Sequence, residues 1–194
     1  MNPQDHSLEI DQLVAAATAL ADTKHARQVR RNGEPVVQHL REVAALAMSI
    51  GTDCLAFSDR TRRDSSPQEL YAAGCLHACL EDTNATYEEV ARAAGLRVAA
   101  WVAQVSRDKR LPWRQGHVAY ERQLSRASLA ARAVKLADLL ADLRGLTGTE
   151  DRAWITGYLD HVDRLLRLIR PGLDRCPQLQ EAAELARGWR QRLA

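Results

Sequence analysis

The chain has 194 residues, a formal net charge of +2, and 27 basic against 25 acidic residues, a balance that excludes a dedicated nucleic-acid binder. Its 32 alanines and 26 leucines outnumber its 12 valines and 4 isoleucines, so helix formers dominate and an all-β fold is excluded. Arginine supplies 24 of the basic residues. Arginine suits bidentate phosphate binding, but a GC-rich genome produces the same bias, and we assign most of it to the genome.

Membrane insertion and secretion are not indicated. No apolar run approaches the ~20 residues of a membrane span, and the polar N-terminus has no signal-peptide pattern. We therefore expect a soluble, cytosolic protein. Its four cysteines, at positions 54, 75, 79 and 176, include no C-x-x-C pair, which predicts reduced, packed thiols rather than a redox or zinc site.

Apolar periodicity and capping residues predict helices along the whole chain. After the first helix, Asn32, Gly33 and Pro35 mark a turn that places Arg30 and Arg31 on an ordered loop. The helices are expected over residues 8–25, 37–50, 67–80, 86–95, 98–105, 115–124, 128–146, 151–169 and 177–193.

The segment 52–66 is polar and is interpreted as a mobile surface loop. Because no internal repeat or domain linker interrupts the chain, we predict one all-α domain over residues 1–194. It should be a bundle of about eight to ten helices.

Three polar residues occupy positions where the pattern predicts core: His39, His77 and Asp138. A carboxylate among leucines is costly unless it is paired or binds a metal. Each histidine could equally be a satisfied core residue, and Asp138 could pair with Lys135 one turn earlier. Taken separately, none of them identifies a metal site.

Two adjacent acids, Glu81 and Asp82, follow His77 by about one helical turn. A carboxylate near a metal-bound water can accept its proton, as hydrolysis of a phosphate ester or anhydride requires. The alternative is that this segment only ends a helix and begins a turn.

The motifs taken together, in their order along the chain, identify a protein family more specifically than any single motif does. Segments 24–35, 76–83, 105–112 and 135–144, together with His39, resemble the HD-type hydrolase domain of the RelA/SpoT alarmone enzymes. Within that family the chain is most similar to the stand-alone small alarmone hydrolases and the metazoan SpoT homologue. The resemblance covers about residues 10–190 and implies an all-helical HD domain.

The resemblance also implies an activity, which is hydrolysis of the 3′-pyrophosphate of guanosine tetra- or pentaphosphate to GDP or GTP plus pyrophosphate. One manganese ion would be held by His39, His77, position 78 and Asp138. Glu81 and Asp82 would orient and deprotonate the attacking water. The substrate would contact Arg30, Arg31 and Lys109 through its pyrophosphate, and Lys135, Asp142 and Tyr158 along the nucleotide.

The chain departs from this family pattern at position 78, where Ala78 replaces the aspartate of the His-Asp doublet. Alanine offers no electron pair, so we expect weaker metal binding and little turnover. Asp142 replaces a usual asparagine, Leu40 a usual proline and Val36 a usual aromatic residue. A deliberate inactivating substitution or a natural loss of activity would each give Ala78, and retention of the neighbouring acids favours the first.

Several functions stay open at this point. The substrate could be an adenosine alarmone or a nicotinamide dinucleotide phosphate instead of a guanosine alarmone. A non-catalytic nucleotide sensor is the alternative from another class, and a plain helical bundle would leave Glu81, Asp82 and Asp138 unexplained. We expect a small-molecule nucleotide as partner and no nucleic acid or membrane. The sequence leaves homo-oligomerisation open.

Overall fold

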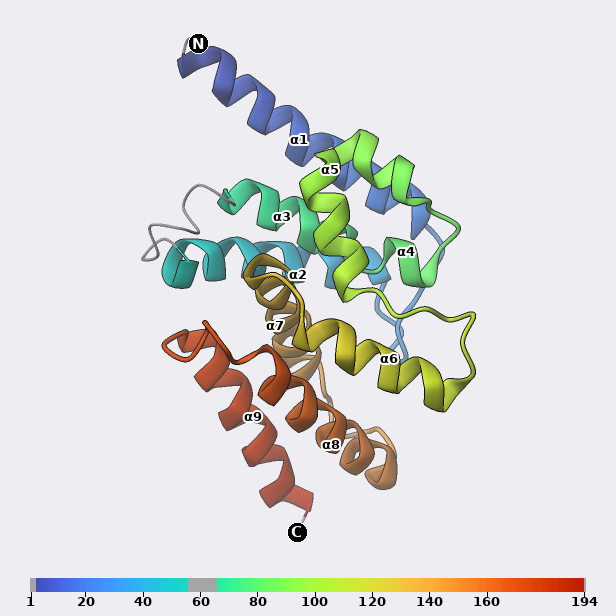
Figure 1. The fold of residues 1–194 in the computed structure, drawn as a ribbon. Helices are drawn as coiled ribbons and strands as arrows, with labels where there is room; N and C mark the ends of the chain where they lie inside the picture. The colour runs from blue at the N-terminus through green and yellow to red at the C-terminus, as the bar shows by residue number, and fades with distance from the viewer. Residues whose placement is uncertain (1–2, 56–65, 194) are drawn as a thin grey trace.

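The computed structural model describes residues 3–55 and 66–193, with side chains from residue 11 onward (Figure 1). Over these residues the regular elements are helices, and none of them is long and apolar enough to cross a membrane. The all-α fold class is therefore confirmed. In chain order the elements are α1 (Pro3–Lys24), α2 (Val36–Ile50), η1 (Gly51–Leu55), α3 (Pro67–Leu76), α4 (Cys79–Asp82), α5 (Tyr87–Val105), α6 (Trp113–Ser125), α7 (Leu129–Arg144), α8 (Arg152–Ile169) and α9 (Pro177–Leu193).

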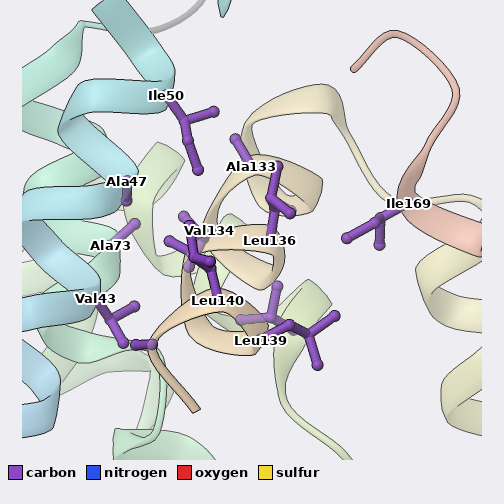
Figure 2. Packing of buried hydrophobic residues seen from close by; sticks show 14 of the residues in the cluster. Val43, Ala47, Ile50, Ala73, Ala133, Val134, Leu136, Leu139, Leu140 and Ile169 are labelled. Carbon is purple, nitrogen blue, oxygen red and sulfur yellow. The ribbon is translucent and has the colours of Figure 1, made fainter. Parts of the chain in front are cut away.

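Helix α7 lies at the centre of the fold, and α2, α3, α5, α8 and α9 all pack against it (Figure 1). Its alanines and, apart from Leu129, its leucines are buried, which is typical of a core helix. Figure 2 shows Val134 and Leu140 of α7 among buried side chains of α2 and α3. The charged residues Lys135, Asp138 and Asp142 are spaced to share one face of this helix.

Helices α2 and α3 approach each other closely at Gly74. A Cβ atom on Gly74 would lie 2.6 Å from the Cα of Ala44, well inside van der Waals contact. Only glycine therefore permits this backbone approach. The approach brings the polar residues of the two helices near one another.

Capping residues set several helix starts. Ser66 with Glu69, and Thr86 with Glu89, form capping boxes at the starts of α3 and α5. Gly95 has a φ of 84° and bends the chain as the sequence predicted. The two expected helices on either side of Gly95 run on as one bent element, α5.

Two expected boundaries are wrong. Helix α3 ends at Leu76 instead of continuing to residue 80, and a short α4 follows. The His77 ring accounts for the break, because its Nδ1 lies 2.7 Å from the Gly74 carbonyl oxygen. In a continuing helix that oxygen would accept the backbone N–H of Ala78. Residues 51–55 form the π-helical turn η1 and not a loop, while residues 56–65 of the expected loop lie outside the described residues.

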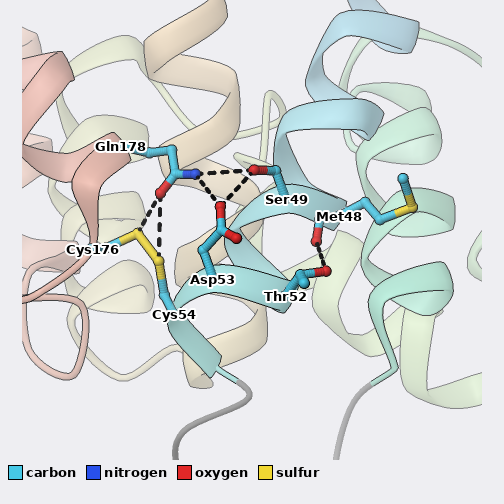
Figure 3. Close-up of a disulfide and its surroundings, with 7 residues drawn as sticks. All are labelled: Met48, Ser49, Thr52, Asp53, Cys54, Cys176 and Gln178. Atoms are coloured by element: carbon cyan, nitrogen blue, oxygen red, sulfur yellow. Dashed lines mark hydrogen bonds between the residues drawn. A yellow bond between two sulfur atoms is a disulfide. The ribbon is translucent and has the colours of Figure 1, made fainter.

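The expectation of four reduced cysteines is also wrong. Cys54 and Cys176 form a disulfide, with Cα atoms 5.3 Å apart (Figure 3). The two residues are separated by 122 positions in the sequence, so their proximity depends on tertiary packing that no local spacing reveals. Cys75 and Cys79 are free and buried, as expected.

Candidate active site

Three helical segments bring His39, His77 and Asp138 together. His39 lies in the first turn of α2, His77 directly follows α3, and Asp138 lies in the middle of α7. The donor atoms of the three side chains all lie within 4.8 Å of one another. Residues far apart in the sequence thus form one nearly buried cluster of two imidazoles and a carboxylate.

The orientation of His77 is fixed by its own helix. Its Nδ1 donates to the carbonyl oxygen of Gly74 at 2.7 Å, which leaves Nε2 facing Asp138 Oδ1 at 3.4 Å. Burial disfavours protonation of the ring, but the Asp138 carboxylate outweighs it and raises the pKa of His77. A histidine held through Nδ1 by a backbone carbonyl presents Nε2 as most metal-binding histidines do.

The ring of His39 is less completely partnered. Its Nε2 lies 3.2 Å from Asp138 Oδ1, and its Nδ1 lies 3.9 Å from Asp142 Oδ1. That buried Nδ1 makes no hydrogen bond to any part of the chain that the structure describes. Buried polar atoms are rarely left unpaired, so this nitrogen marks a position where a ligand or water belongs.

Lys135 and Asp138 form a buried ion pair, with Lys135 Nζ 2.7 Å from Asp138 Oδ2. Burial alone would raise the pKa of Asp138, but Lys135 and the two histidines hold it well below its usual range. The salt bridge and the histidine cluster therefore coexist. Asp138 uses one oxygen for the lysine and the other for the histidines.

Glu81 and Asp82 are each held by a cation from the loop after α5. Glu81 Oε2 accepts the backbone N–H of Arg107 at 2.8 Å, and Glu81 Oε1 lies 3.3 Å from Arg107 Nε. Asp82 pairs with Lys109. Sequence reasoning missed Arg107, although its place in the charged segment 105–112, two residues before Lys109, was a usable signal.

These groups line one cavity of about 290 Å³. It contains both acids and the three-residue cluster, while Ala78 contributes only a methyl group to its wall. The site residues expected from the sequence that line it are Arg30, His39, His77, Glu81, Asp82, Lys135, Asp138 and Asp142. Lys109 lines a different cavity, which shares Glu81 with this one.

A second cavity, of about 180 Å³, adjoins the first through Arg30 and Asp142, which line both. The guanidinium of Arg31 lies 4.6 Å from the centre of the Trp154 ring. Trp154 in turn stacks on Tyr158 at 5.4 Å with an interplanar angle of 3°. This aromatic wall includes a residue, Trp154, that the sequence placed on a helix near Tyr158 but did not assign to the site.

Two groups between these cavities are electrostatically unusual. Burial and the nearby Asp138 charge raise the pKa of Asp142, which pairs with Arg30. Burial and the same two carboxylates raise the pKa of Tyr158 well above its usual value. The Tyr158 hydroxyl is buried and has no hydrogen-bond partner among the residues that the structure describes.

The sequence also matches a known protein family. A family model described as an HD domain matches residues 17–156. The chain belongs to the HD-domain family. The match spans the elements that supply His39, His77 and Asp138 as well as the aromatic residue Trp154.

The HD-domain relatives include named alarmone hydrolases. Human guanosine-3′,5′-bis(diphosphate) 3′-pyrophosphohydrolase MESH1 is 33% identical over 182 residues, which are 90% of this chain and 92% of the relative. A guanosine-3′,5′-bis(diphosphate) 3′-pyrophosphohydrolase of Aquifex aeolicus strain VF5 is 31% identical over 136 residues, which are 69% of this chain but 18% of that protein.

The HD fold also agrees with a solved structure. A metazoan orthologue of SpoT, described as hydrolysing ppGpp, superposes with a TM-score of 0.71 and 23% identity, covering 91% of this chain and 94% of that one. At this identity the likeness supports the fold alone.

The donor set of this HD domain fits a divalent cation. Two imidazole nitrogens and one carboxylate oxygen are ligands that such ions accept, and three protein ligands leave room for water. His77 is oriented by a backbone carbonyl as metal-binding histidines commonly are. Ala78 contributes no donor, so the cluster holds one ligand fewer than the HD pattern implies.

Proposed function

We propose that this HD domain binds an alarmone nucleotide and that its site is arranged to hydrolyse the 3′-pyrophosphate of guanosine tetra- or pentaphosphate. The observation that carries the proposal is the convergence of His39, His77 and Asp138 in one cavity with Glu81 and Asp82. The named activity of relatives such as human MESH1 supports the same substrate class.

His39, His77 and Asp138 are proposed to hold one manganese ion. Such an ion, when bound, polarises a phosphoryl oxygen and lowers the pKa of a coordinated water. The imidazoles must be unprotonated at their ligating nitrogens to do this. The Nδ1 bond of His77 to Gly74 leaves Nε2 available for that role.

Glu81 and Asp82 are proposed to hold the attacking water and accept its proton. Arg107 fixes both oxygens of Glu81, so this carboxylate is preorganised and has little freedom to turn away. Lys109 pairs with one oxygen of Asp82. The two acids thus face the cavity from one side, supported by the loop after α5.

Arg30 and Arg31 are proposed to neutralise the phosphates. Arg30 now pairs with Asp142, so an incoming polyanion competes with that carboxylate for the guanidinium. The raised pKa of Asp142 favours its protonation as negative charge approaches. Arg30 can then turn to the substrate at a lower electrostatic cost.

The purine is proposed to lie in the second cavity, beside Arg31, Trp154 and Tyr158. Flat aromatic and guanidinium surfaces stack favourably on nucleobases. The unpaired hydroxyl of Tyr158 and the side chain of Lys135 supply polar groups along the nucleotide. Stacking alone does not choose between bases, so adenosine alarmones and nicotinamide dinucleotide phosphates belong in the same test.

Replacing Ala78 with aspartate tests the mechanism. We expect Ala78→Asp to raise manganese-dependent pyrophosphate release from guanosine tetraphosphate by more than about 100-fold, because loss of an outer-shell group alone costs about 10- to 100-fold. Pyrophosphate release would be followed for the parent chain and the variant across guanosine and adenosine alarmones, with phosphate release measured for the dinucleotide.

The control combines Ala78→Asp with His39→Ala, which removes a different proposed ligand and should return activity to the parent level. If Ala78→Asp leaves turnover unchanged although manganese binds, the ligand assignment is wrong. Nucleotide binding by the parent chain without bound manganese, shown by calorimetry and metal analysis, would instead favour the sensor function.

A further inference from the structure

A second polar cluster lies at the C-terminal end of α2, away from the cavity just described. It consists of Ser49, Asp53, Gln178 and the disulfide between Cys54 and Cys176 (Figure 3). The disulfide joins η1 to the residue just before α9. Gln178, which is 9% exposed, lies between the disulfide and the end of α2.

The amide of Gln178 can adopt only one sensible orientation. Its Nε2 donates to Ser49 Oγ at 3.1 Å and to Asp53 Oδ2 at 3.0 Å. A carboxylate accepts and cannot donate, so the nitrogen must face Asp53. The amide oxygen is thereby turned toward the sulfurs, and Gln178 Oε1 lies 3.0 Å from Cys176 Sγ and 3.5 Å from Cys54 Sγ.

The hydrogen bonding of the Gln178 oxygen differs between the two redox states of the cysteines. Thiols carry an S–H that can donate to Gln178 Oε1, whereas disulfide sulfurs carry no hydrogen. Within the described part of the chain, the two sulfurs are the groups that face this nearly buried oxygen. Among the described residues, closing the disulfide therefore leaves this buried acceptor without a donor, and opening the disulfide supplies one.

We propose that Cys54 and Cys176 form a reversible thiol–disulfide exchange site whose open state is stabilised by Gln178. The reductant is a small soluble thiol of the glutathione class. This proposal does not depend on the proposed nucleotide chemistry, because neither cysteine lines the cavities that hold the nucleotide-binding and catalytic candidates.

A small thiol has a route to the site. Asp53, Cys54 and Cys176 line a cavity of about 550 Å³ together with the turn 172–175. Cys54 is partly exposed, whereas Cys176 is 1% exposed, so attack falls on the sulfur of Cys54. The other two thiols do not compete, because burial raises the pKa of Cys75 and raises that of Cys79 to about 12.

The exchange balances in two steps. The thiolate of a small thiol bonds to Cys54 Sγ, the Cys54–Cys176 bond breaks, and Cys176 leaves as a thiolate that takes up a proton. The thiolate of a second small thiol then bonds to the sulfur of the first small thiol in the mixed disulfide, the bond to Cys54 Sγ breaks, and Cys54 leaves as a thiolate that takes up a proton. Two small thiols are oxidised to one small disulfide, while the protein disulfide is reduced by two electrons.

The test is equilibration of the full chain in glutathione buffers of graded reduced-to-oxidised ratio, followed by acid quenching, alkylation and mass measurement. The parent protein should open at the ratios of a reducing cell interior, where structural disulfides resist reduction. Gln178→Met removes the acceptor at similar volume. It should shift the midpoint toward the disulfide by about threefold to tenfold, the value of one hydrogen bond.

The matched control is Ser49→Ala, which removes a partner of the Gln178 nitrogen but keeps the oxygen, so the midpoint should stay at the parent value. A parent disulfide that stays closed at every ratio, or thiols that stay open in oxidised glutathione, overturns the proposal without use of any variant. Equal midpoints for the parent and Gln178→Met overturn the role of Gln178. Circular dichroism of each variant establishes that the compared proteins are folded.

Discussion

The two ends of helix α2 carry polar clusters of opposite character. At the first turn, His39 lies near Asp138 and Asp142, Lys135 pairs with Asp138, and charge holds the cluster together. At the last turn, the Gln178 amide nitrogen donates to Ser49 and Asp53, and the Gln178 amide oxygen faces the Cys54–Cys176 disulfide (Figure 3). The first cluster opens on two cavities and retains an unpaired buried nitrogen on His39.

This difference teaches how to separate a ligand site from a redox-dependent contact in a helical protein. Both clusters contain buried polar groups, so burial of polar groups alone does not distinguish them. The first cluster contains a buried ion pair and lines two cavities, so a ligand can reach its unpaired imidazole nitrogen. In the second cluster, the redox state of Cys54 and Cys176 decides whether the Gln178 oxygen has a donor.

The largest effect is expected from removing one charge of the first cluster. Asp138→Leu leaves Lys135 buried without its partner and should lower the free energy of unfolding by about 3–5 kcal/mol. Ser49→Ala at the other end of α2 removes a hydroxyl that accepts from Gln178 and donates to Asp53, but leaves no buried charge unpaired, and should cost about 1–2 kcal/mol. Urea unfolding of both variants at neutral pH measures the difference.

The control for Asp138→Leu is the double variant Lys135→Met, Asp138→Leu, in which neither charge remains. Most of the lost stability should return, because the cost comes from the uncompensated lysine and not from lost packing. If Asp138→Leu costs no more than Ser49→Ala, the two ends of α2 do not differ in the way described.

A smaller effect is expected at the contact that brings the histidines together. Gly74→Ala places a methyl group 2.6 Å from the Cα of Ala44, so α2 and α3 must separate. Overpacking of this kind should cost about 1–3 kcal/mol. It should also weaken manganese binding, because His39 and His77 move apart. Thermal unfolding and metal titration give the two readouts.

Gly157→Ala provides the matched control in the exposed part of α8, where a new Cβ meets nothing within 4 Å. Alanine in a helix interior is favoured over glycine by about 0.5–1 kcal/mol, so this variant should be neutral or stabilising. A Gly74→Ala protein that is as stable as Gly157→Ala would mean that the close approach of α2 and α3 does not position the site.

The helices could be predicted from the sequence because their signals are local. Capping boxes such as Thr86 with Glu89 mark helix starts through residues three positions apart. The end of α3 could not be predicted, since it depends on a histidine ring taking the Gly74 carbonyl. The Cys54–Cys176 disulfide could not be predicted for a related reason, because it joins segments 122 residues apart.

The sequence indicated which residues line the candidate site, but not which of them contact one another. Polar residues in apolar stretches, such as His77 and Asp138, stand out in a sequence because their burial needs compensation. Which partner compensates them is a tertiary property. Lys109, which is expected at the phosphates, also pairs with Asp82, and the contact of Arg107 with Glu81 was not expected.

The smallest expected effect is a pH dependence of the unfolding free energy, which should arise from the cluster at the first end of α2 and not from the cluster at the other end. The pKa of His77 is raised above its ordinary 6.5, so its stabilising charge is fully present below pH 6.5 and is lost as pH rises through the folded value. Without metal, unfolding free energy should fall with a slope of at most about 1.4 kcal/mol per pH unit in that window. The pKa values of His25 and His161 are lowered, so those groups change stability below pH 6.5 and not above it.

Urea unfolding in chelator at several pH values above 6.5 measures this slope. His77→Gln should flatten it because glutamine does not titrate, whereas Gln178→Met should leave it unchanged because the amide it replaces carries no proton equilibrium in this range. An unchanged slope in His77→Gln would assign the titration to another group. A slope lost in Gln178→Met would show that the two ends of α2 are coupled, and the independence of the histidine cluster from the thiol–disulfide cluster would then fail.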